Sequence, residues 1–191
     1  MAQKESTFLN MFLTLFVVTA LSSLAASAVY NITKEPIARV QREKQQKAIR
    51  EVMPGFTNYK VVKVMPQDGK DSITIYKGYK DKEEVGAAVE TYTNIGYSGL
   101  VKLMVGFKPD GSITNIEVLE QKETPGLGTK MTTEKFRGQF RGKNPATFIV
   151  KVKKDGGEVD AITAATISSR AFCDAVNRAY RSFETIKKEN Q

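Results

Sequence analysis

The chain has 191 residues and a formal net charge of +8, from 29 Lys and Arg against 21 Asp and Glu. That length accommodates one membrane-spanning segment and one domain of ordinary size. The chain has no His, which excludes Ser-His-Asp catalysis, His-ligated zinc or haem, and a histidine general base. Its single cysteine, Cys173, excludes an intramolecular disulfide and a multi-cysteine metal site, so we expect no metal and a buried structural thiol. The basic residues are spread along the chain and mixed with Glu, which argues against a nucleic-acid interface.

The N-terminal segment has the composition of a membrane anchor. No residue from Ser6 to Thr33 is charged, and Phe8–Tyr30 is dense in Phe, Leu, Val and Ala. As a helix, Phe8–Tyr30 would extend over roughly 34 Å, enough to cross a hydrocarbon core of about 30 Å. We therefore expect residues 1–33 to form a single transmembrane helix in the lipid bilayer. A cleaved signal peptide is the alternative, because Ala26-Ser27-Ala28 matches an A-x-A cleavage site.

A charged segment follows the anchor. Residues 34–54 are expected to form a stalk helix with Pro36 at its first position and an end at Pro54-Gly55. Six Lys and Arg lie between Lys34 and Arg50, which by the positive-inside rule would place the following domain in the cytoplasm. The rule is weakest before long translocated domains, so the charge count alone does not decide on which side of the membrane the domain lies.

Residues 55–191 carry the pattern of an α+β domain, with one antiparallel sheet and flanking helices behind the transmembrane helix. A strong hairpin turn is expected at Lys108-Pro-Asp-Gly111, and the imperfect alternation after it predicts a bulge. A short helix is expected over Thr133–Phe140. The strand-like runs are Val61–Met65, Ser72–Tyr79, Val85–Tyr92, Leu100–Phe107, Ser112–Leu119 and Thr147–Val152.

The last helix is expected from about Thr163 to Ile186. Its spacing predicts one buried face made of Ile167, Ala171, Val176, Ala179 and Phe183. A hydroxyl-rich segment, Asp160-Ala-Ile-Thr-Ala-Ala-Thr-Ile-Ser168-Ser169, lies at its start. Taken alone, such a segment is typical of a helix cap, although the first turn of a helix also suits a phosphate.

Three segments together resemble one known family. The segment from Asp160 to Ser168 matches the flavinylation pattern Asp-x-x-Ser/Thr-Gly/Ala-Ala-Thr-x-Ser/Thr, Lys122–Gly128 reads Lys-Glu-Thr-Pro-Gly-Leu-Gly, and Gly96–Gly99 reads Gly-Tyr-Ser-Gly before a strand. Their order and spacing are similar to the FMN-binding domain in the G subunit of the Rnf complex, which is shared by the C subunit of the sodium-translocating NADH:quinone reductase. The similarity extends over nearly the whole chain.

The resemblance implies one covalent FMN per chain, joined to Thr166 through a phosphoester by a separate flavin transferase. It implies that the flavin site is formed by Thr166 with Thr163, Ala165, Thr124, Leu127, Gly128 and Tyr97. Asp160 and Ser168 would be recognised by the transferase. From the residues alone, Lys122–Gly128 could equally be a plain loop, and Tyr97 could simply pack in the core.

The implied function is electron relay in an Rnf-type complex that couples ferredoxin:NAD oxidoreduction to ion translocation. The partners would be other membrane, iron–sulfur and flavin subunits, and the chain would have no complete active site of its own. The resemblance places the flavin domain outside the cytoplasm, on a single-pass anchor in the cell (inner) membrane. The alternatives are the C subunit of a sodium-translocating NADH:quinone reductase and a membrane-tethered binding module without redox function.

Overall fold

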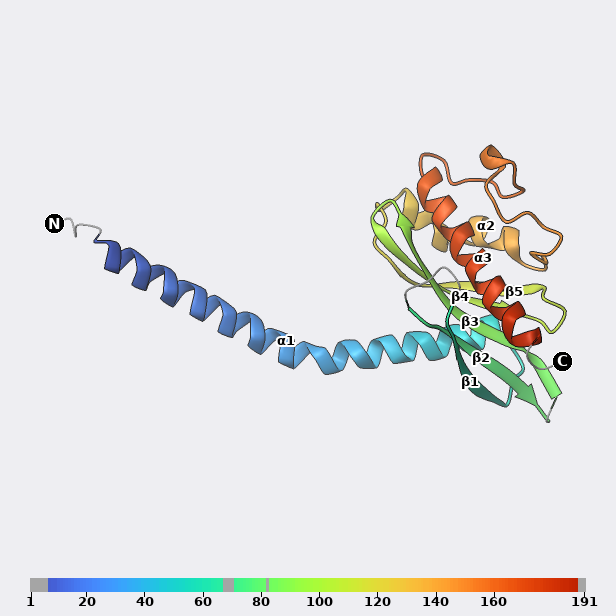
Figure 1. Cartoon of the computed structure of the whole chain (residues 1–191), viewed down its shortest axis with the longest axis horizontal. Coiled ribbons are helices and arrows are strands. Elements are labelled where there is room, and N and C mark those ends of the chain that lie inside the picture. Colours follow the sequence, from blue (N-terminus) through green and yellow to red (C-terminus); the bar gives the residue numbers. More distant parts are fainter. Residues whose placement is uncertain (1–6, 67–70, 82, 189–191) are drawn as a thin grey trace. The chain divides into compact units, whose positions relative to one another are not determined.

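The computed structural model describes residues 7–66, 71–81 and 83–188 (Figure 1). The chain divides into two compact units, residues 1–44 and 45–191. The second unit therefore includes residues 45–54, which the sequence pattern assigned to the stalk.

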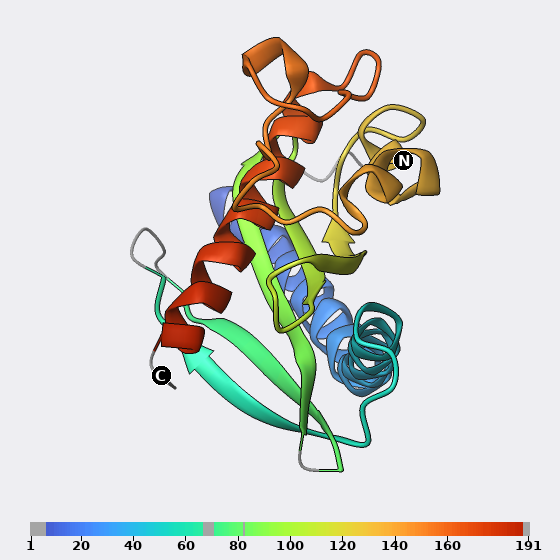
Figure 2. The same cartoon turned by 90° about the vertical axis from the view of Figure 1, so that its right-hand side faces the viewer.

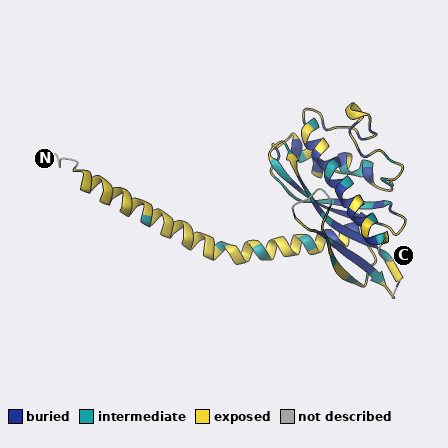
Figure 3. Ribbon diagram, in the orientation of Figure 1, coloured by how far each residue is buried: buried dark blue, intermediate teal, exposed yellow. Residues whose placement is uncertain are grey.

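Helix α1 runs from Phe8 to Val52. Its N-terminal part is almost entirely exposed, as Figure 3 shows, and large apolar side chains such as Phe8 and Leu24 are 79% and 68% exposed. The helix contains an 18-residue window with a mean hydropathy of 2.0. Among the described residues it is the one helix long and apolar enough to cross a membrane. Lipid tails are as apolar as these side chains, so burying the side chains in a bilayer would carry no free-energy penalty.

The expected break at Pro36 was wrong, because Pro36 lies inside helix α1. A proline in a helix interior removes one backbone hydrogen bond and costs about 3 kcal/mol. Lys34 and Glu35 before it and Ala38 and Arg39 after it are good helix formers, and the helix continues on both sides. The proline penalty is therefore outweighed, and the segments predicted as anchor and stalk lie in one helix, Phe8–Val52.

The second unit contains a five-stranded antiparallel sheet whose strand order follows the chain (Figure 1). Five of the six predicted strand segments are confirmed, which confirms the α+β fold. The sixth, Thr147–Val152, was wrong. Asn144 O accepts the N–H groups of Thr147 and Phe148 in a turn, and the Asn177 side chain donates to Val150 O at 2.8 Å. These contacts use backbone groups that a strand would pair, and pairing in this segment is limited to one parallel bridge between Val152 and Val159. The strands are β1 (Asn58–Val64), β2 (Ile73–Lys80), β3 (Glu83–Gly96), β4 (Gly99–Phe107) and β5 (Ile113–Gln121).

The turn between β4 and β5 has the predicted form. Gly111 N–H donates to Lys108 O at 2.9 Å, and Gly111 has a φ of +90°, which glycine adopts without strain. The β4–β5 register shifts at two points, between Lys102 and Leu103 and between Val105 and Phe107, so the expected irregularity is confirmed. The predicted short helix is present as α2 (Glu134–Arg137), which a single 3-10 turn extends to Phe140.

Helix α3 (Thr166–Lys188) lies along one face of the sheet, as Figure 2 shows, and forms the larger core with it. Side chains of adjacent strand residues point to opposite faces, so Val89 and Val105 contact this core while Ala88 and Met104 do not. The predicted buried face of α3 is confirmed at Ala171, Val176, Ala179 and Phe183. Ile167 is the exception, because it is 45% exposed.

The end of α1 covers the other face of the sheet. Its last turns and Met53 form a second core with residues of the sheet, comprising Ala48, Ile49, Val52, Met53, Tyr76, Ala88 and Met104. A polar network borders it, in which the Glu90 carboxylate accepts from Gln45 and Tyr76 and pairs with Lys102. Burial, reinforced by the charge of Glu90, raises the pKa of the Tyr76 phenol far above its usual range. The second core ties the helix to the sheet.

Candidate functional site

A pocket of about 540 Å³ lies where the three motif segments meet. Its walls come from the loop after β5, the turn between β3 and β4, and the start of α3. A volume of this size falls within the range of small-molecule sites in proteins. The lining residues are Tyr97, Glu123, Thr124, Leu127, Gly128, Ala164, Ala165, Thr166, Ile167 and Ser168.

The side chain of Glu123 connects the walls of this pocket. It is only 4% exposed, and its Oε1 accepts a hydrogen bond from the Ser98 N–H at 3.1 Å. Its Oε2 accepts a short hydrogen bond from the Ser168 hydroxyl. The Glu123 N–H in turn donates to Gln121 Oε1 at 2.7 Å, which orders the backbone where β5 ends. Each oxygen of the buried carboxylate therefore accepts one hydrogen bond, and each bond comes from a different one of the other two motifs.

Two glycines leave room for this carboxylate. A Cβ on Gly128 would lie 2.6 Å from both Glu123 Cβ and Ser168 Oγ. A Cβ on Gly96 would lie 2.6 Å from Glu123 Oε1 and 2.4 Å from Gly99 O. Real Cβ contacts essentially never come this close, so both positions require glycine if Glu123 keeps its place.

Helix α3 begins at Thr166 rather than at Thr163, which corrects the predicted start. Ala164 has a φ of +60°, a left-handed conformation that costs an L-residue roughly 1–2 kcal/mol. Ser169 holds this turn in place, because its hydroxyl accepts the Ile162 N–H at 2.9 Å and donates to Ala165 O at 3.0 Å. The left-handed residue interrupts the helical path, so the hydroxyl-rich segment forms a tight turn before the helix.

Thr166 is the first residue of α3 and lines the pocket, where it is half-buried. Within the described residues its hydroxyl makes no hydrogen bond, so it does not cap the helix. The N–H groups of a first helical turn have no acceptor inside the helix, and the helix dipole is positive at this end. A free hydroxyl and an electropositive backbone thus lie together at the pocket wall, an arrangement that suits a phosphate.

The structure brings most of the predicted site residues together. The pocket is lined by Tyr97, Thr124, Leu127, Gly128, Ala165, Thr166 and Ser168, all singled out from the sequence. Tyr97 is 69% exposed, so it does not pack in the core. Thr163 is exposed and does not line the pocket. The sequence reasoning missed three lining residues, Glu123, Ala164 and Ile167. A signal existed for Glu123, since it is the sole acidic residue between Lys122 and Gly128.

The two residues expected to meet a transferase differ in accessibility. Asp160 is at the surface, where its carboxylate pairs with Lys153 at 2.7 Å. Its backbone is fixed by Gln139, which accepts the Asp160 N–H at 2.8 Å and donates to the Asp160 O at 3.2 Å. Ser168, in contrast, is buried and its hydroxyl faces Glu123. The Asp160 carboxylate is therefore accessible from outside the domain, whereas the Ser168 hydroxyl makes an internal contact.

The following turns of α3 carry an exposed ion pair and a buried thiol. Arg170 donates from Nε and Nη2 to the two carboxylate oxygens of Asp155 at 2.6 and 2.7 Å. These hydrogen bonds, with the charge of Arg170, hold the pKa of Asp155 below its usual range. Cys173 is buried, as expected, and this burial raises the pKa of its thiol to about 12. The thiol is thus protonated and unreactive at neutral pH.

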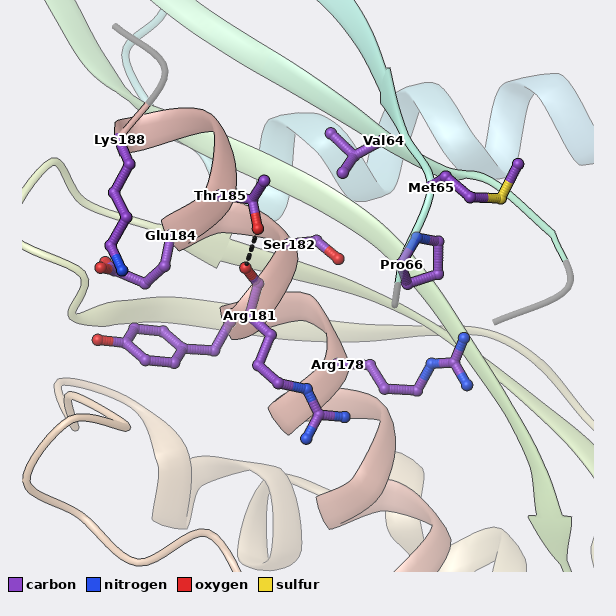
Figure 4. Close-up of a pocket in the computed structure, with 10 residues that line it drawn as sticks. Val64, Met65, Pro66, Arg178, Arg181, Ser182, Glu184, Thr185 and Lys188 are labelled. Carbon is purple, nitrogen blue, oxygen red and sulfur yellow. Dashed lines mark hydrogen bonds between the residues drawn. The ribbon is translucent and has the colours of Figure 1, made fainter. Parts of the chain in front are cut away.

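A second pocket, of about 630 Å³, lies near the other end of α3 (Figure 4). Val64, Met65 and Pro66 form one side, and the last turns of α3 form the other. The Arg178 side chain lines it and lies over the Tyr92 ring, with Cζ 4.6 Å from the ring centre. Among the residues that the structure describes, none from the three sequence motifs lines this second pocket.

Comparison with known proteins identifies the family. A family model described as an FMN-binding domain matches residues 96–181, which include all three motifs. The G subunit of the ion-translocating oxidoreductase complex of Methanosarcina acetivorans is 34% identical over 169 residues, covering 87% of this chain and 89% of that protein. The corresponding G subunit of Escherichia coli K12 is 35% identical over 190 residues, covering 91% and 90%.

A third relative is the G subunit of the Na(+)-translocating ferredoxin:NAD(+) oxidoreductase complex of Acetobacterium woodii, 31% identical over 190 residues and covering 92% of this chain and 91% of that protein. Among solved structures, NqrC of Shewanella oneidensis superposes with a TM-score of 0.51 at 20% identity, over 73% of each chain. That likeness supports the fold alone. The identity to the curated relatives, sustained over nearly the full length of both chains, shows that this chain belongs to the G-subunit family of ion-translocating oxidoreductase complexes.

Proposed function

We propose that this chain is a flavin-carrying electron-transfer subunit of an Rnf-type complex, with one FMN joined covalently to Thr166. The observation that carries the proposal is the position of Thr166. It completes the flavinylation pattern, begins α3, and presents an unbonded hydroxyl to a pocket built from the three motifs. The name of the Acetobacterium woodii relative supports the choice of ferredoxin:NAD oxidoreduction coupled to ion translocation.

The residues of the pocket fit an FMN group. Apolar or aromatic surfaces of Tyr97, Leu127 and Ile167 would hold the flat ring system, and the first turn of α3 would receive the phosphate. Thr124 and Ala165 would complete the walls. FMN supplies the ability to accept and donate one or two electrons reversibly, chemistry that the side chains lining the pocket do not themselves provide.

Attachment requires a second enzyme and an activated donor. A threonine hydroxyl does not attack a phosphate unaided. Among the described residues no His, Lys or Arg lines the pocket, and the one carboxylate there, Glu123, accepts from Ser98 and Ser168 rather than from Thr166. The donor would be a flavin dinucleotide. The Thr166 Oγ–phosphorus bond forms as the pyrophosphate bond breaks, a nucleoside monophosphate leaves, and the hydroxyl proton passes to the flavin transferase. Asp160, exposed and fixed by Gln139, is the carboxylate that the transferase would grip.

The chain's own contribution to electron relay is to hold the group in a defined position. A covalent bond at the first residue of a 23-residue helix restricts the flavin to one wall of the domain. Partner subunits carrying flavins or iron–sulfur centres would exchange electrons with it there. The pocket is partly open to solvent at Tyr97, which would let a partner approach the ring closely.

The decisive test of attachment is substitution of Thr166. Thr166→Ala should abolish covalent flavin, seen as loss of the FMN mass increment and of visible absorbance after denaturation, when the chain is produced together with a flavin transferase. Stability should change by no more than about 1 kcal/mol, because the hydroxyl makes no contact that the fold needs. Thr185→Ala, at an exposed threonine of the same helix, is the matched control and should load fully. The proposal is refuted if Thr166→Ala still carries covalent flavin. It is also refuted if the wild-type chain stays colourless, as a binding module without redox function would.

We further propose that the flavin domain lies outside the cytoplasm, as the family resemblance implies, on the single anchor formed by α1. A membrane-impermeant thiol reagent can test this once Cys173 has been replaced by Ala. Gln45 is a poor labelling site, because its amide is hydrogen-bonded to Tyr76 and Glu90. Gln41 is exposed and suitable. A Gln41→Cys chain should be labelled in intact cells, and labelling only after lysis would place the domain in the cytoplasm.

A further inference from the structure

The three motifs of the site meet at a single side chain, the carboxylate of Glu123. Glu123 is 4% exposed, whereas its chain neighbours Lys122 and Thr124 are exposed. A buried carboxylate is costly unless hydrogen-bond donors compensate it. Here two donors do so, and they come from segments 25 and 45 residues away along the chain.

Each donor belongs to a different wall of the pocket. The Ser98 N–H is in the turn between β3 and β4, next to Tyr97. The Ser168 hydroxyl is in the first turn of α3, two residues after Thr166. A single carboxylate therefore joins the wall that carries Tyr97 to the wall that carries Thr166. Gly128 passes so closely over this junction that any larger residue would displace it.

We propose that Glu123 is a positioning residue, and that Glu123, Ser98 and Ser168 form a carboxylate clamp that holds Thr166 and the Tyr97 wall in register for flavin attachment. This inference rests on the proposed function for its consequence, although the clamp itself is a property of the unloaded chain. Thr166 must enter the active site of the flavin transferase. If the backbone at the start of α3 is already fixed, less conformational entropy is lost when the transferase binds Thr166 in the reactive geometry.

Glu123 would also act through its charge. It is the one charged residue among the ten that line the pocket. A negative charge in the wall of a flavin site opposes the addition of electrons to the ring, and the effect is strong where water is excluded. The carboxylate would therefore keep the reduction potential of the bound FMN lower than a neutral side chain would.

Two substitutions separate the clamp from the charge. Glu123→Ala removes both hydrogen bonds. Glu123→Gln removes the charge but keeps both contacts. Its carbonyl oxygen can accept from the Ser98 N–H, and its amide NH2 can donate to the Ser168 oxygen. Glu90→Gln is the control, because Glu90 is a mostly buried, hydrogen-bonded carboxylate in the polar network on the α1 side of the sheet. All variants are made as full-length chains in detergent, each with and without a flavin transferase.

The first measurement is amide hydrogen exchange on the unloaded chains. Glu123→Ala should exchange at least tenfold faster than wild type in peptides covering 96–99 and 163–169, while Glu123→Gln and Glu90→Gln should not. Wild-type exchange in Glu123→Ala, or an equal acceleration in Glu90→Gln, overturns the clamp. This measurement needs no flavin, so it decides the clamp even if the wild-type chain proves unable to accept FMN, a result that would refute the proposed function instead.

The second measurement follows flavin loading and potential. Glu123→Ala should load at least tenfold more slowly than wild type, and Glu123→Gln should load within about threefold of the wild-type rate. The FMN potential of Glu123→Gln should shift to a more positive value, and that of Glu90→Gln should stay unchanged. Wild-type loading by Glu123→Ala overturns the positioning role, and an unchanged potential in Glu123→Gln overturns the role of the charge.

Discussion

Replacing Gly128 with Ala tests how tightly the pocket is built. The new methyl group would lie 2.6 Å from Glu123 Cβ, 2.6 Å from Ser168 Oγ and 2.8 Å from Glu123 Oε2. Relief of these contacts requires a shift of roughly 1 Å, and overpacking of this kind typically costs about 1–3 kcal/mol. The shift would also weaken a hydrogen bond to a buried carboxylate, which contributes about 1.5–3 kcal/mol. We therefore expect Gly128→Ala to destabilise the domain by ~3 kcal/mol.

Thermal unfolding followed by circular dichroism measures this loss, which corresponds to a Tm lower by about 6–12 °C. Gly126→Ala is the control, since a Cβ there would meet nothing within 4 Å. Its only expected destabilisation, roughly 1 kcal/mol, comes from placing an L-residue at a φ of +74°. Ser168→Ala removes one of the atoms in the way, so the double variant Gly128→Ala/Ser168→Ala should lose less stability than the two single changes added together. This account of the packing would be refuted if Gly128→Ala and Gly126→Ala destabilised the domain equally and the losses from Gly128→Ala and Ser168→Ala simply added in the double variant.

The other predictions concern titration and reactivity. Cys173 should resist a thiol reagent in the folded protein at pH 8 and react fully in denaturant, because burial raises its pKa to about 12; rapid labelling of the native protein would contradict this. Since the pKa of Asp155 is lowered from 3.8 by Arg170, the pair should stabilise the fold above about pH 4 and lose that contribution as the pH falls through the folded-state pKa. Asp155→Asn should therefore flatten the acid side of the Tm–pH curve, and an unaltered curve would show that the exposed pair contributes nothing.

The sequence predicted those elements whose signals are local. The turn at Lys108–Gly111 follows from residue types that adopt its dihedral angles, and five strands follow from their β-branched and aromatic content. The segment Thr147–Val152 has similar content but is not a strand. Its backbone groups are taken by the Asn177 side chain and by a turn at Asn144, and no periodicity in the segment itself reports those contacts.

The site shows the same division. The motif residues that line the pocket were found because the family pattern names them, and their types suit a phosphate and a ring. The motif contains Glu123, but the sequence alone assigns this residue no role, because its partners are 25 and 45 residues away. The left-handed turn at Ala164 was missed because alanine rarely adopts a positive φ, and the contacts of Ser169 that hold it there are visible only in three dimensions.

The second core has a consequence for the order in which the protein forms during synthesis. The buried residues of the second core lie between Ala48 and Met104, and Leu119 on β5 packs against them, so this side can close before α3 has been made. The opposite side waits for α3, which ends at Lys188 and is translated last. An N-terminal element that emerges early thus shields one apolar surface during the interval in which a half-made sheet is most prone to aggregate. Shortening α1 by its last two turns should therefore lower the yield of folded protein more than its equilibrium stability would suggest.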